Sequence, residues 1–347
     1  MKNNYKKALL WAVKVFLITG TALMFVCPFS CRATEEGIVL IKDNTPGPAI
    51  ENFYVTSKST VRVVFNKEIL VKEASVTPKV NIAEISVNRE NSESLWFADF
   101  IFGNELAVGE CFSLYGEVAD KVGNTLTFSI PFKGYNSNIP EILITEIHPM
   151  YGSSTSKTSG TVYKCEYVEF YAKTGGNLSG LELYSASDGK EKKYSFPAIE
   201  VSEGEIITVH LRKKEGMNAV NETGSVINLS STYYSSSEAR DLWEENESAR
   251  LGDYSDVIYI SDSQTGIILD GVCYCSSENT EWKNEELKSV CEKVCGAGVW
   301  PSSDIQDALC SDGLTLSKSL ERISSGKGKE CWKVTDKSGT NPGKICF

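Results

Sequence analysis

Residue types that commonly perform catalysis are scarce in this 347-residue chain, which has only two histidines. His148 precedes Pro149 in an expected loop, and His210 lies in an expected strand. The sequence has no His-Glu-x-x-His zinc motif, no Gly-x-Ser-x-Gly nucleophile elbow, no Gly-Lys-Ser/Thr phosphate loop and no complete Asp-rich calcium loop. We therefore expect a protein without catalytic residues, bound metal or cofactor.

The first 33 residues have the composition of an export signal. Lys2, Lys6 and Lys7 precede an apolar run over residues 8–29 that only Lys14 interrupts. Three outcomes stay open: a lipoprotein signal with Cys31 as the lipidated residue, cleavage after Cys31-Arg32-Ala33 by an ordinary signal peptidase, or an uncleaved anchor barely long enough to span a bilayer. Each places the remaining chain outside the cytoplasm, in the cell envelope or on the surface, and the favoured outcome is a membrane-anchored lipoprotein.

Cysteines are the other reactive group. Seven fall in the last quarter of the chain: Cys273, Cys275, Cys291, Cys295, Cys310, Cys331 and Cys346. In an exported chain the default is disulfides, each worth about 2–4 kcal/mol. We hypothesise that a strand carrying positions 273 and 275 is bridged to a helix carrying positions 291 and 295, with a third bridge from the remaining three. A four-thiolate zinc site is the alternative, but zinc sites usually use Cys-x-x-Cys pairs. Cys111, isolated in sequence, is the expected unpaired thiol.

The composition of the chain limits the kind of partner and the number of domains that we expect. With 46 acidic against 35 basic residues, the net charge of −11 argues against a nucleic-acid partner, since that affinity comes mostly from Lys and Arg. A hydrophobic fraction of 41% excludes wholesale disorder, and the length predicts two or three domains.

The strand patterns predict two consecutive domains. After a polar linker over residues 34–46, alternating apolar residues recur between turns through residues 47–134, with a closing edge strand at residues 126–132. The segment Val61-Arg-Val-Val-Phe-Asn-Lys-Glu and the later Asp120-Lys-Val-Gly-Asn turn resemble bacterial Ig-like domains of cell-envelope proteins. The resemblance implies a β-sandwich.

Residues 140–347 contain a second set of strand patterns. Ile144-Thr-Glu-Ile, Glu166-Tyr-Val-Glu-Phe, Asn177-Leu-Ser-Gly-Leu-Glu-Leu, Phe196-Pro, Leu269-Asp-Gly-Val and Ser319-Leu-Glu-Arg-Ile occur in the order of the lamin tail domain, which this region resembles. The resemblance implies a second Ig-like sandwich. The expected fold is therefore all-β, with two tandem sandwiches and short helices in inserted loops of the second.

The lamin-tail resemblance also implies roles for three charged residues. Glu146 and Glu169 lie on expected strands, where a carboxylate is costly unless paired, and Arg322 in the closing motif is their expected structural partner. Because such domains also occur beside nucleases and phosphoesterases, an accessory or cryptic metal-dependent hydrolase is the alternative, with Glu146, His148 and Glu169 as metal ligands.

Insertions distinguish this chain from typical bacterial members of that family. They cover residues 151–164, 213–250 and 276–313. We expect residues 213–250 to be a mobile loop with one short helix at 238–245. In this helix Trp243 is either a binding aromatic or a staple, that is, a side chain that pins the loop to the sandwich. Residues 281–296 are expected to be a helix with Leu287, Val290 and Val294 on one stripe. The favoured function is a non-catalytic binding or structural module that contacts an unknown protein or an envelope polymer through surface loops.

Lipid anchoring has a direct test. In a bacterial host fed labelled palmitate, the full-length protein is expected to incorporate the label, and Cys31→Ala is expected to abolish it, as seen by gel autoradiography. Retention of the label in the Cys31→Ala variant would exclude this attachment site.

Overall fold

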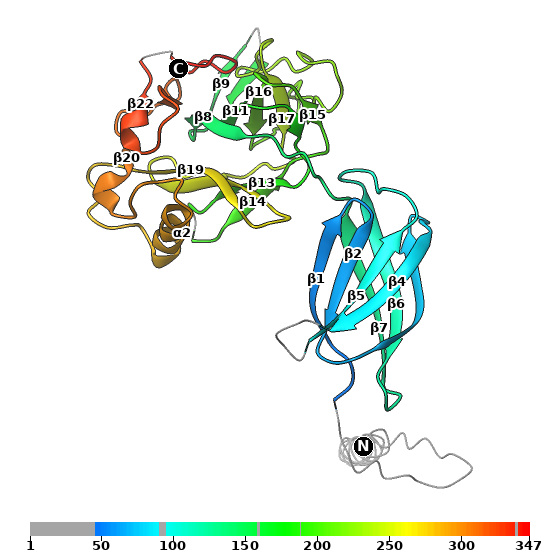
Figure 1. Cartoon of the computed structure of the whole chain (residues 1–347). Helices are drawn as coiled ribbons and strands as arrows, with labels where there is room; N and C mark the ends of the chain where they lie inside the picture. The colour runs from blue at the N-terminus through cyan, green and yellow to red at the C-terminus, as the bar shows by residue number, and fades with distance from the viewer. Residues whose placement is uncertain (1–45, 90–94, 158–159, 188, 337–338) are drawn as a thin grey trace, which may run out of the picture. The chain divides into compact units, whose positions relative to one another are not determined.

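The computed structural model describes residues 46–347 except 90–94, 158–159, 188 and 337–338 (Figure 1). The predicted signal at residues 1–33, Cys31 and nearly all of the predicted linker lie outside the described residues. The described part is mainly β-strand, with a single α-helix and two short 3-10 helices, which confirms the all-β prediction. No helix in this part is long and apolar enough to form a membrane span.

The first sandwich pairs a four-stranded sheet, in the order β1-β2-β5-β4, with a three-stranded sheet, β3-β6-β7. Its strands are β1 (Ile50–Ser57), β2 (Thr60–Phe65), β3 (Leu70–Thr77), β4 (Ile82–Arg89), β5 (Trp96–Phe102), β6 (Cys111–Ala119) and β7 (Thr125–Lys133). All its pairings are antiparallel. Pro131 lies in β7, the predicted edge strand, where a missing N–H is tolerated.

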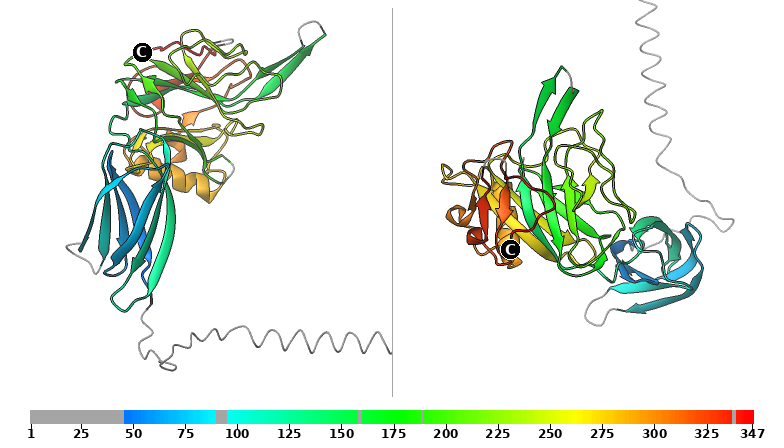
Figure 2. Two further views of the ribbon diagram at one scale, coloured as in Figure 1. Left: turned by 90° about the vertical axis from the view of Figure 1, so that its right-hand side faces the viewer. Right: turned by 90° about the horizontal axis from the view of Figure 1, so that it is seen from above.

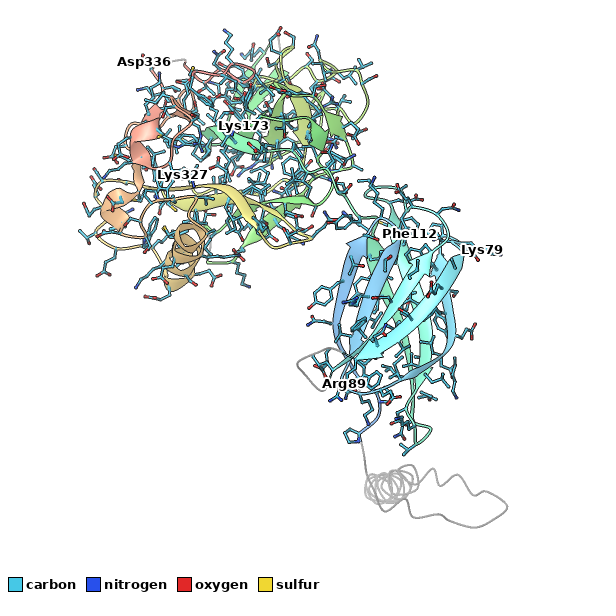
Figure 3. The ribbon with its side chains drawn as sticks, viewed as in Figure 1. Lys79, Arg89, Phe112, Lys173, Lys327 and Asp336 are labelled. Atoms are coloured by element: carbon cyan, nitrogen blue, oxygen red, sulfur yellow. The ribbon has the colours of Figure 1, made fainter. Side chains whose placement is uncertain are left out.

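Alternation of side chains places an apolar core between these two sheets. Val61, Val63 and Phe65 of β2 share one face and are fully buried. The Phe65 ring meets Phe128 of the opposite sheet at 6.1 Å between centroids, and Phe112, labelled in Figure 3, belongs to the same cluster. The period-two pattern read from the sequence is therefore the pattern of burial.

The second sandwich has larger sheets. A six-stranded sheet runs β17-β16-β11-β8-β21-β22, and a five-stranded sheet runs β14-β13-β18-β19-β20. The first comprises β17 (Arg240–Trp243), β16 (Ile206–His210), β11 (Tyr167–Ala172), β8 (Ile142–His148), β21 (Leu320–Arg322) and β22 (Trp332–Val334). The second comprises β14 (Lys192–Ser195), β13 (Leu181–Ser185), β18 (Asp256–Asp262), β19 (Ile268–Cys275) and β20 (Leu309–Cys310). Two small pairs complete it: β9 (Gly152–Ser156) with β10 (Gly160–Lys164), and β12 (Gly176–Asn177) with β15 (Glu200–Val201).

One continuous hydrophobic core joins the two large sheets. Val168 and Phe170 of β11 pack in the same cluster as Leu181 and Leu183 of β13. Phe170 also meets Phe196 edge-on, with 5.5 Å between ring centroids. The facing sheets therefore form a sandwich, as expected (Figure 1).

The helix α2 (Glu285–Gly296) lies within the predicted range 281–296 and begins after Asn284, whose side chain accepts a hydrogen bond from the Leu287 amide at 2.8 Å. Its stripe of Leu287, Val290 and Val294 is buried, as predicted. At Gly271 of β19 an added Cβ would lie 2.7 Å from a Val294 methyl carbon. This glycine therefore lets α2 pack closely against the sheet.

The loops contain two 3-10 helices and one unexpected strand. The 3-10 helices are η1 (Ile305–Asp307), which is capped by Asp304, and η2 (Lys329–Cys331). The short helix predicted at 238–245 is wrong, because residues 240–243 form β17, which adds in parallel to β16. All four residues of β17 are buried. Their backbone groups are paired with β16 on one side and with Asn221 and Glu222 on the other.

The predicted pairing of Arg322 with Glu146 and Glu169 is also wrong. The Arg322 guanidinium bonds Asp270 of the opposite sheet at 2.6 Å and the Ile144 carbonyl at 2.6 Å, while Asp270 accepts the Ile144 amide at 2.8 Å. Burial raises the pKa of Asp270, and Arg322 opposes that rise. Arg322 therefore ties the two sheets together through Asp270.

Removing this tie is expected to destabilise the protein. Arg322→Met leaves the buried Asp270 carboxylate without its cation, so we expect a loss of about 3–5 kcal/mol in the free energy of unfolding, measured with urea. Lys173→Met, which breaks the exposed pair with Glu141, is the matched control and should cost under about 1 kcal/mol. Equal effects of the two variants would contradict this role.

Candidate functional site

A row of polar side chains crosses five strands on the face of the six-stranded sheet turned away from the core. Register pairs Asp241 with Thr208, Thr208 with Glu169, Glu169 with Glu146, and Glu146 with Glu321. We name these five residues the acidic row. None is more than 9% exposed, so four carboxyl groups are held out of water.

A second row, two residues along each strand, is aromatic. It consists of Trp243, His210, Tyr167 and His148, which are paired across β17, β16, β11 and β8. The rings of Trp243 and His210 stack at 3.9 Å between centroids, and those of Tyr167 and His148 stack at 5.5 Å. We name it the aromatic row. All four members are buried.

Two segments cover these rows. From the inserted segment, residues 213–250, the Tyr234 ring lies 4.7 Å from His148 and 5.3 Å from Tyr167. From the C-terminal segment, residues 339–347, the Asn341 amide donates to Glu146 at 3.3 Å and the Gly343 amide donates to Glu169 at 2.5 Å. Gly343 has φ +87°, a conformation that favours glycine.

The inserted segment is anchored by buried side chains. Glu222, fully buried, accepts the amides of Leu229 at 2.6 Å and of Asp241 at 2.8 Å. The Trp243 indole donates to Ser230 at 3.1 Å. Trp243 is therefore a staple and not an exposed binding aromatic, and the segment is pinned to the sheet along much of its length.

The two central carboxyls of the acidic row are perturbed by burial. Desolvation raises the pKa of Glu146 to about 7, although Ser319 and Asn341 donate to it. Desolvation and then the neighbouring Glu146 raise the pKa of Glu169 to about 8, against donors from Gly343 and Thr145. Such values allow acid–base chemistry, but both carboxyls lie beneath the covering segments.

The two histidines are equally enclosed. Burial lowers the pKa of His148 to about 4, and its Nε2 lies 3.2 Å from the Tyr234 hydroxyl. His210 Nε2 bonds Asp241 at 2.8 Å, which is the orienting pair of a hydrolase triad. The His210 Nδ1 atom, however, has no hydrogen-bond partner among the residues that the structure describes, and Trp243 covers the ring. The pair therefore lacks a nucleophile.

The alternative metal site does not form in the described part of the chain. Glu146 and Glu169 are register neighbours, and His148 belongs to the aromatic row. No group of three or more His, Cys, Asp or Glu residues there is arranged to hold a metal ion.

The seven C-terminal cysteines do not gather at one place, and none of the described cysteines is disulfide-bonded. Cys291 lies 3.3 Å from Cys273 between their sulfur atoms, as the hypothesis of a bridge between helix and strand requires. Cys275 lies beside Cys310 in the β19–β20 register, and not beside Cys295. Cys346 donates to Glu321 at 2.9 Å, and Cys331 donates to the Lys327 carbonyl at 3.6 Å.

An accessible pocket lies between the β9–β10 hairpin, which projects from the second sandwich (Figure 2), and the inserted segment. We name it the loop groove; its volume is about 400 Å³. Its polar and aromatic lining consists of Thr161, Tyr163, Asn218, Ser231, Thr232 and Tyr233. None of the described residues that line it is charged. Tyr233 is 53% exposed, and Lys164 lies over its ring at 4.5 Å.

Sequence reasoning missed the residues that build this region. Tyr234 contacts His148, 86 residues away, and Glu222 accepts the amide of Asp241 in β17, a strand that the sequence pattern did not indicate. The one available signal was the apolar pair Leu242-Trp243 within a polar insertion.

The buried acid pair predicts a pH dependence. A carboxyl whose folded pKa is raised binds a proton more tightly when folded, so its contribution to stability falls as pH rises from about 4.5 towards its folded pKa of about 7 for Glu146. Glu146→Gln keeps an acceptor at Oε1, where Ser319 and Asn341 both donate. Relative to this variant, the wild type should lose up to about 1.4 kcal/mol per pH unit between pH 5 and 7.

Urea unfolding at several pH values measures this difference. Glu141→Gln, at an exposed carboxylate that precedes β8, should follow the wild type at every pH. Parallel curves for wild type and Glu146→Gln would show that Glu146 is ionised normally in the folded protein.

Comparison with known proteins places the second sandwich in a family. Residues 140–334 match the family model TP_1001_2nd, described as "protein second domain". An "Uncharacterized protein" of Treponema pallidum (strain Nichols) is 25% identical over 219 residues, which are 61% of this chain and 53% of that protein. The chain thus spans about half the length of this curated relative.

Solved structures give weaker likenesses. A DUF4876 family protein from Bacteroides thetaiotaomicron VPI-5482 is 11% identical with a TM-score of 0.31, over 80% of this chain and 91% of that one. The N-terminal part of the bacterial S-layer protein SbsC is 16% identical with a TM-score of 0.22, over 44% of each chain. Likenesses this low do not bear on function. Through residues 140–334, the chain belongs to the TP_1001_2nd family of second domains.

Proposed function

We propose that this protein is a non-catalytic binding module of the cell envelope, exported and lipid-anchored at Cys31, whose loop groove binds a neutral, hydroxyl-rich polymer such as a glycan. The observation that carries the proposal is the loop groove itself. It is open to solvent, while the carboxyls of the acidic row and the two histidines are enclosed beneath the inserted and C-terminal segments.

The lining of the groove suits sugar rings. Tyr163 and Tyr233 offer flat rings against which the C–H faces of sugars can pack. Thr161, Asn218, Ser231 and Thr232 supply hydroxyl and amide groups that both donate and accept hydrogen bonds. Without charged side chains, the lining has no strong preference for an ionic ligand.

The groove is also pre-organised. Lys164 lies over the Tyr233 ring, and Tyr234 meets that ring edge-on at 4.9 Å. Asn218 and Ser231 form a bridge with a backbone hydrogen bond of 2.8 Å. A ligand therefore meets side chains that are already held in place, which lowers the entropic cost of binding.

The side chains that could take part in catalysis are enclosed by the protein, which disfavours a catalytic role. Glu146, Glu169, His148 and His210 are each at most 3% exposed. A substrate could reach them only after the C-terminal segment or the inserted segment moved away. Their contacts account for them as structural groups.

Affinity electrophoresis of the full-length protein tests the proposal, with gels containing dextran, mannan or arabinogalactan. We expect at least one polymer to retard the wild type. Tyr233→Ala should weaken that retardation about tenfold, corresponding to about 1.4 kcal/mol, without changing the melting temperature, because the ring is largely exposed.

The matched control is Tyr254→Ala. Tyr254 is 50% exposed and lies outside the groove, so its loss should leave retardation unchanged. The proposal fails if none of the three polymers retards the wild type, or if both variants behave alike.

A further inference from the structure

Three cysteines meet where α2 packs on β19, a place unrelated to the loop groove. Cys273 of β19 and Cys291 of α2 are fully buried, with their sulfur atoms 3.3 Å apart. Cys295, one helical turn after Cys291, lies within hydrogen-bonding reach of both thiols and is partly exposed. We name these three residues the thiol trio.

The members of the trio differ in accessibility and in acidity. The hydrogen bond from Cys273 lowers the pKa of Cys295 to about 7, burial opposes the change, and a hydrogen bond from Cys291 adds to it. Burial raises the pKa of Cys273 well above its usual value. Because the thiolate is the nucleophile, the solvent-reachable Cys295 should react first.

The geometry of the trio determines which two thiols form the final disulfide. The sulfur atoms of Cys273 and Cys291 are already in contact, and the pair links a strand of the sheet to the helix that covers it. Cys273 can bond to only one of its two neighbours at a time, so one thiol of the trio is always left over. A bridge between the buried pair leaves Cys295 as the free, accessible thiol.

We propose that the thiol trio is a thiol–disulfide exchange site that accepts small-molecule disulfides through Cys295. The Cys295 thiolate attacks one sulfur of the disulfide RSSR, the S–S bond breaks, and RS⁻ leaves and takes up a proton. The Cys273 sulfur, on losing its proton, attacks Cys295 Sγ and releases the second RSH. Cys291 then attacks Cys273 Sγ and returns the thiol to Cys295. In total two protein thiols are oxidised and one RSSR is reduced to two RSH.

The exchange has a structural consequence. Once formed, the Cys273–Cys291 bond fastens α2 to the five-stranded sheet, and the remaining Cys295 thiol can reopen it in the presence of RSH. This makes the packing of α2 sensitive to the surrounding ratio of disulfide to thiol. Cys275, beside Cys310, is not a member of the trio.

The test starts from the fully reduced full-length protein and oxidised glutathione at pH 7. Samples are quenched with N-ethylmaleimide and mapped by peptide mass spectrometry. We expect a Cys273–Cys291 bridge with Cys295 alkylated in the wild type. In the double variant Cys273→Ser/Cys291→Ser we expect glutathione to accumulate on Cys295, because neither neighbouring thiol is left to resolve the mixed disulfide.

Two further variants make the result decisive. Cys295→Ser, at a partly exposed position, should retain the melting temperature of the reduced protein and form the buried bridge at least about tenfold more slowly. Cys310→Ser, at an exposed cysteine outside the trio, should leave the rate unchanged. The proposal is overturned if Cys295→Ser forms the bridge at the wild-type rate, or if glutathione in Cys273→Ser/Cys291→Ser adds elsewhere than at Cys295.

Discussion

Burial of the acidic row is the constraint on which the second sandwich depends. Carboxyl groups on a sheet face normally remain in water, and removing them from it is costly unless donors or neutralisation compensate. Here Glu146 and Glu169 receive amide protons from the C-terminal segment. The Asp241 carboxyl is hydrogen-bonded to His210 Nε2, and the Asp241 backbone amide donates to Glu222 of the inserted segment. The covering segments are therefore held in place by the same groups that they remove from water.

Because of that constraint, the two faces of the six-stranded sheet differ in what covers them. One face is apolar and joins the core with the five-stranded sheet, as in any sandwich. The other carries rings and carboxyls, and it needs the inserted segment and residues 339–347 as a further layer. The loop groove lies between the inserted segment of that layer and the β9–β10 hairpin. Under the proposed function, the buried polar groups support this groove and do not act on a ligand.

Local patterns in the sequence were sufficient for the elements but not for their long-range contacts. The strand alternation of β2 and β7 and the stripe of α2 were predicted because each depends on neighbours a few residues away. The predicted partners of Arg322 were wrong. Its actual partner, Asp270, lies in the opposite sheet, and only the packing of the two sheets brings the two residues together. The strand β17 was missed because its burial comes from parallel addition to β16. The resemblance to lamin tail domains stays a prediction.

Residue-resolved amide hydrogen exchange tests the central claim, the enclosure of the acidic row, most directly. We expect the amides of Asn341 and Gly343, which donate to Glu146 and Glu169, to exchange far more slowly than that of the exposed neighbour Lys344 at the same pH. Exchange of all three at the rate of an unstructured peptide would show instead that residues 339–347 do not close over the carboxyls and that the acidic row is open to water.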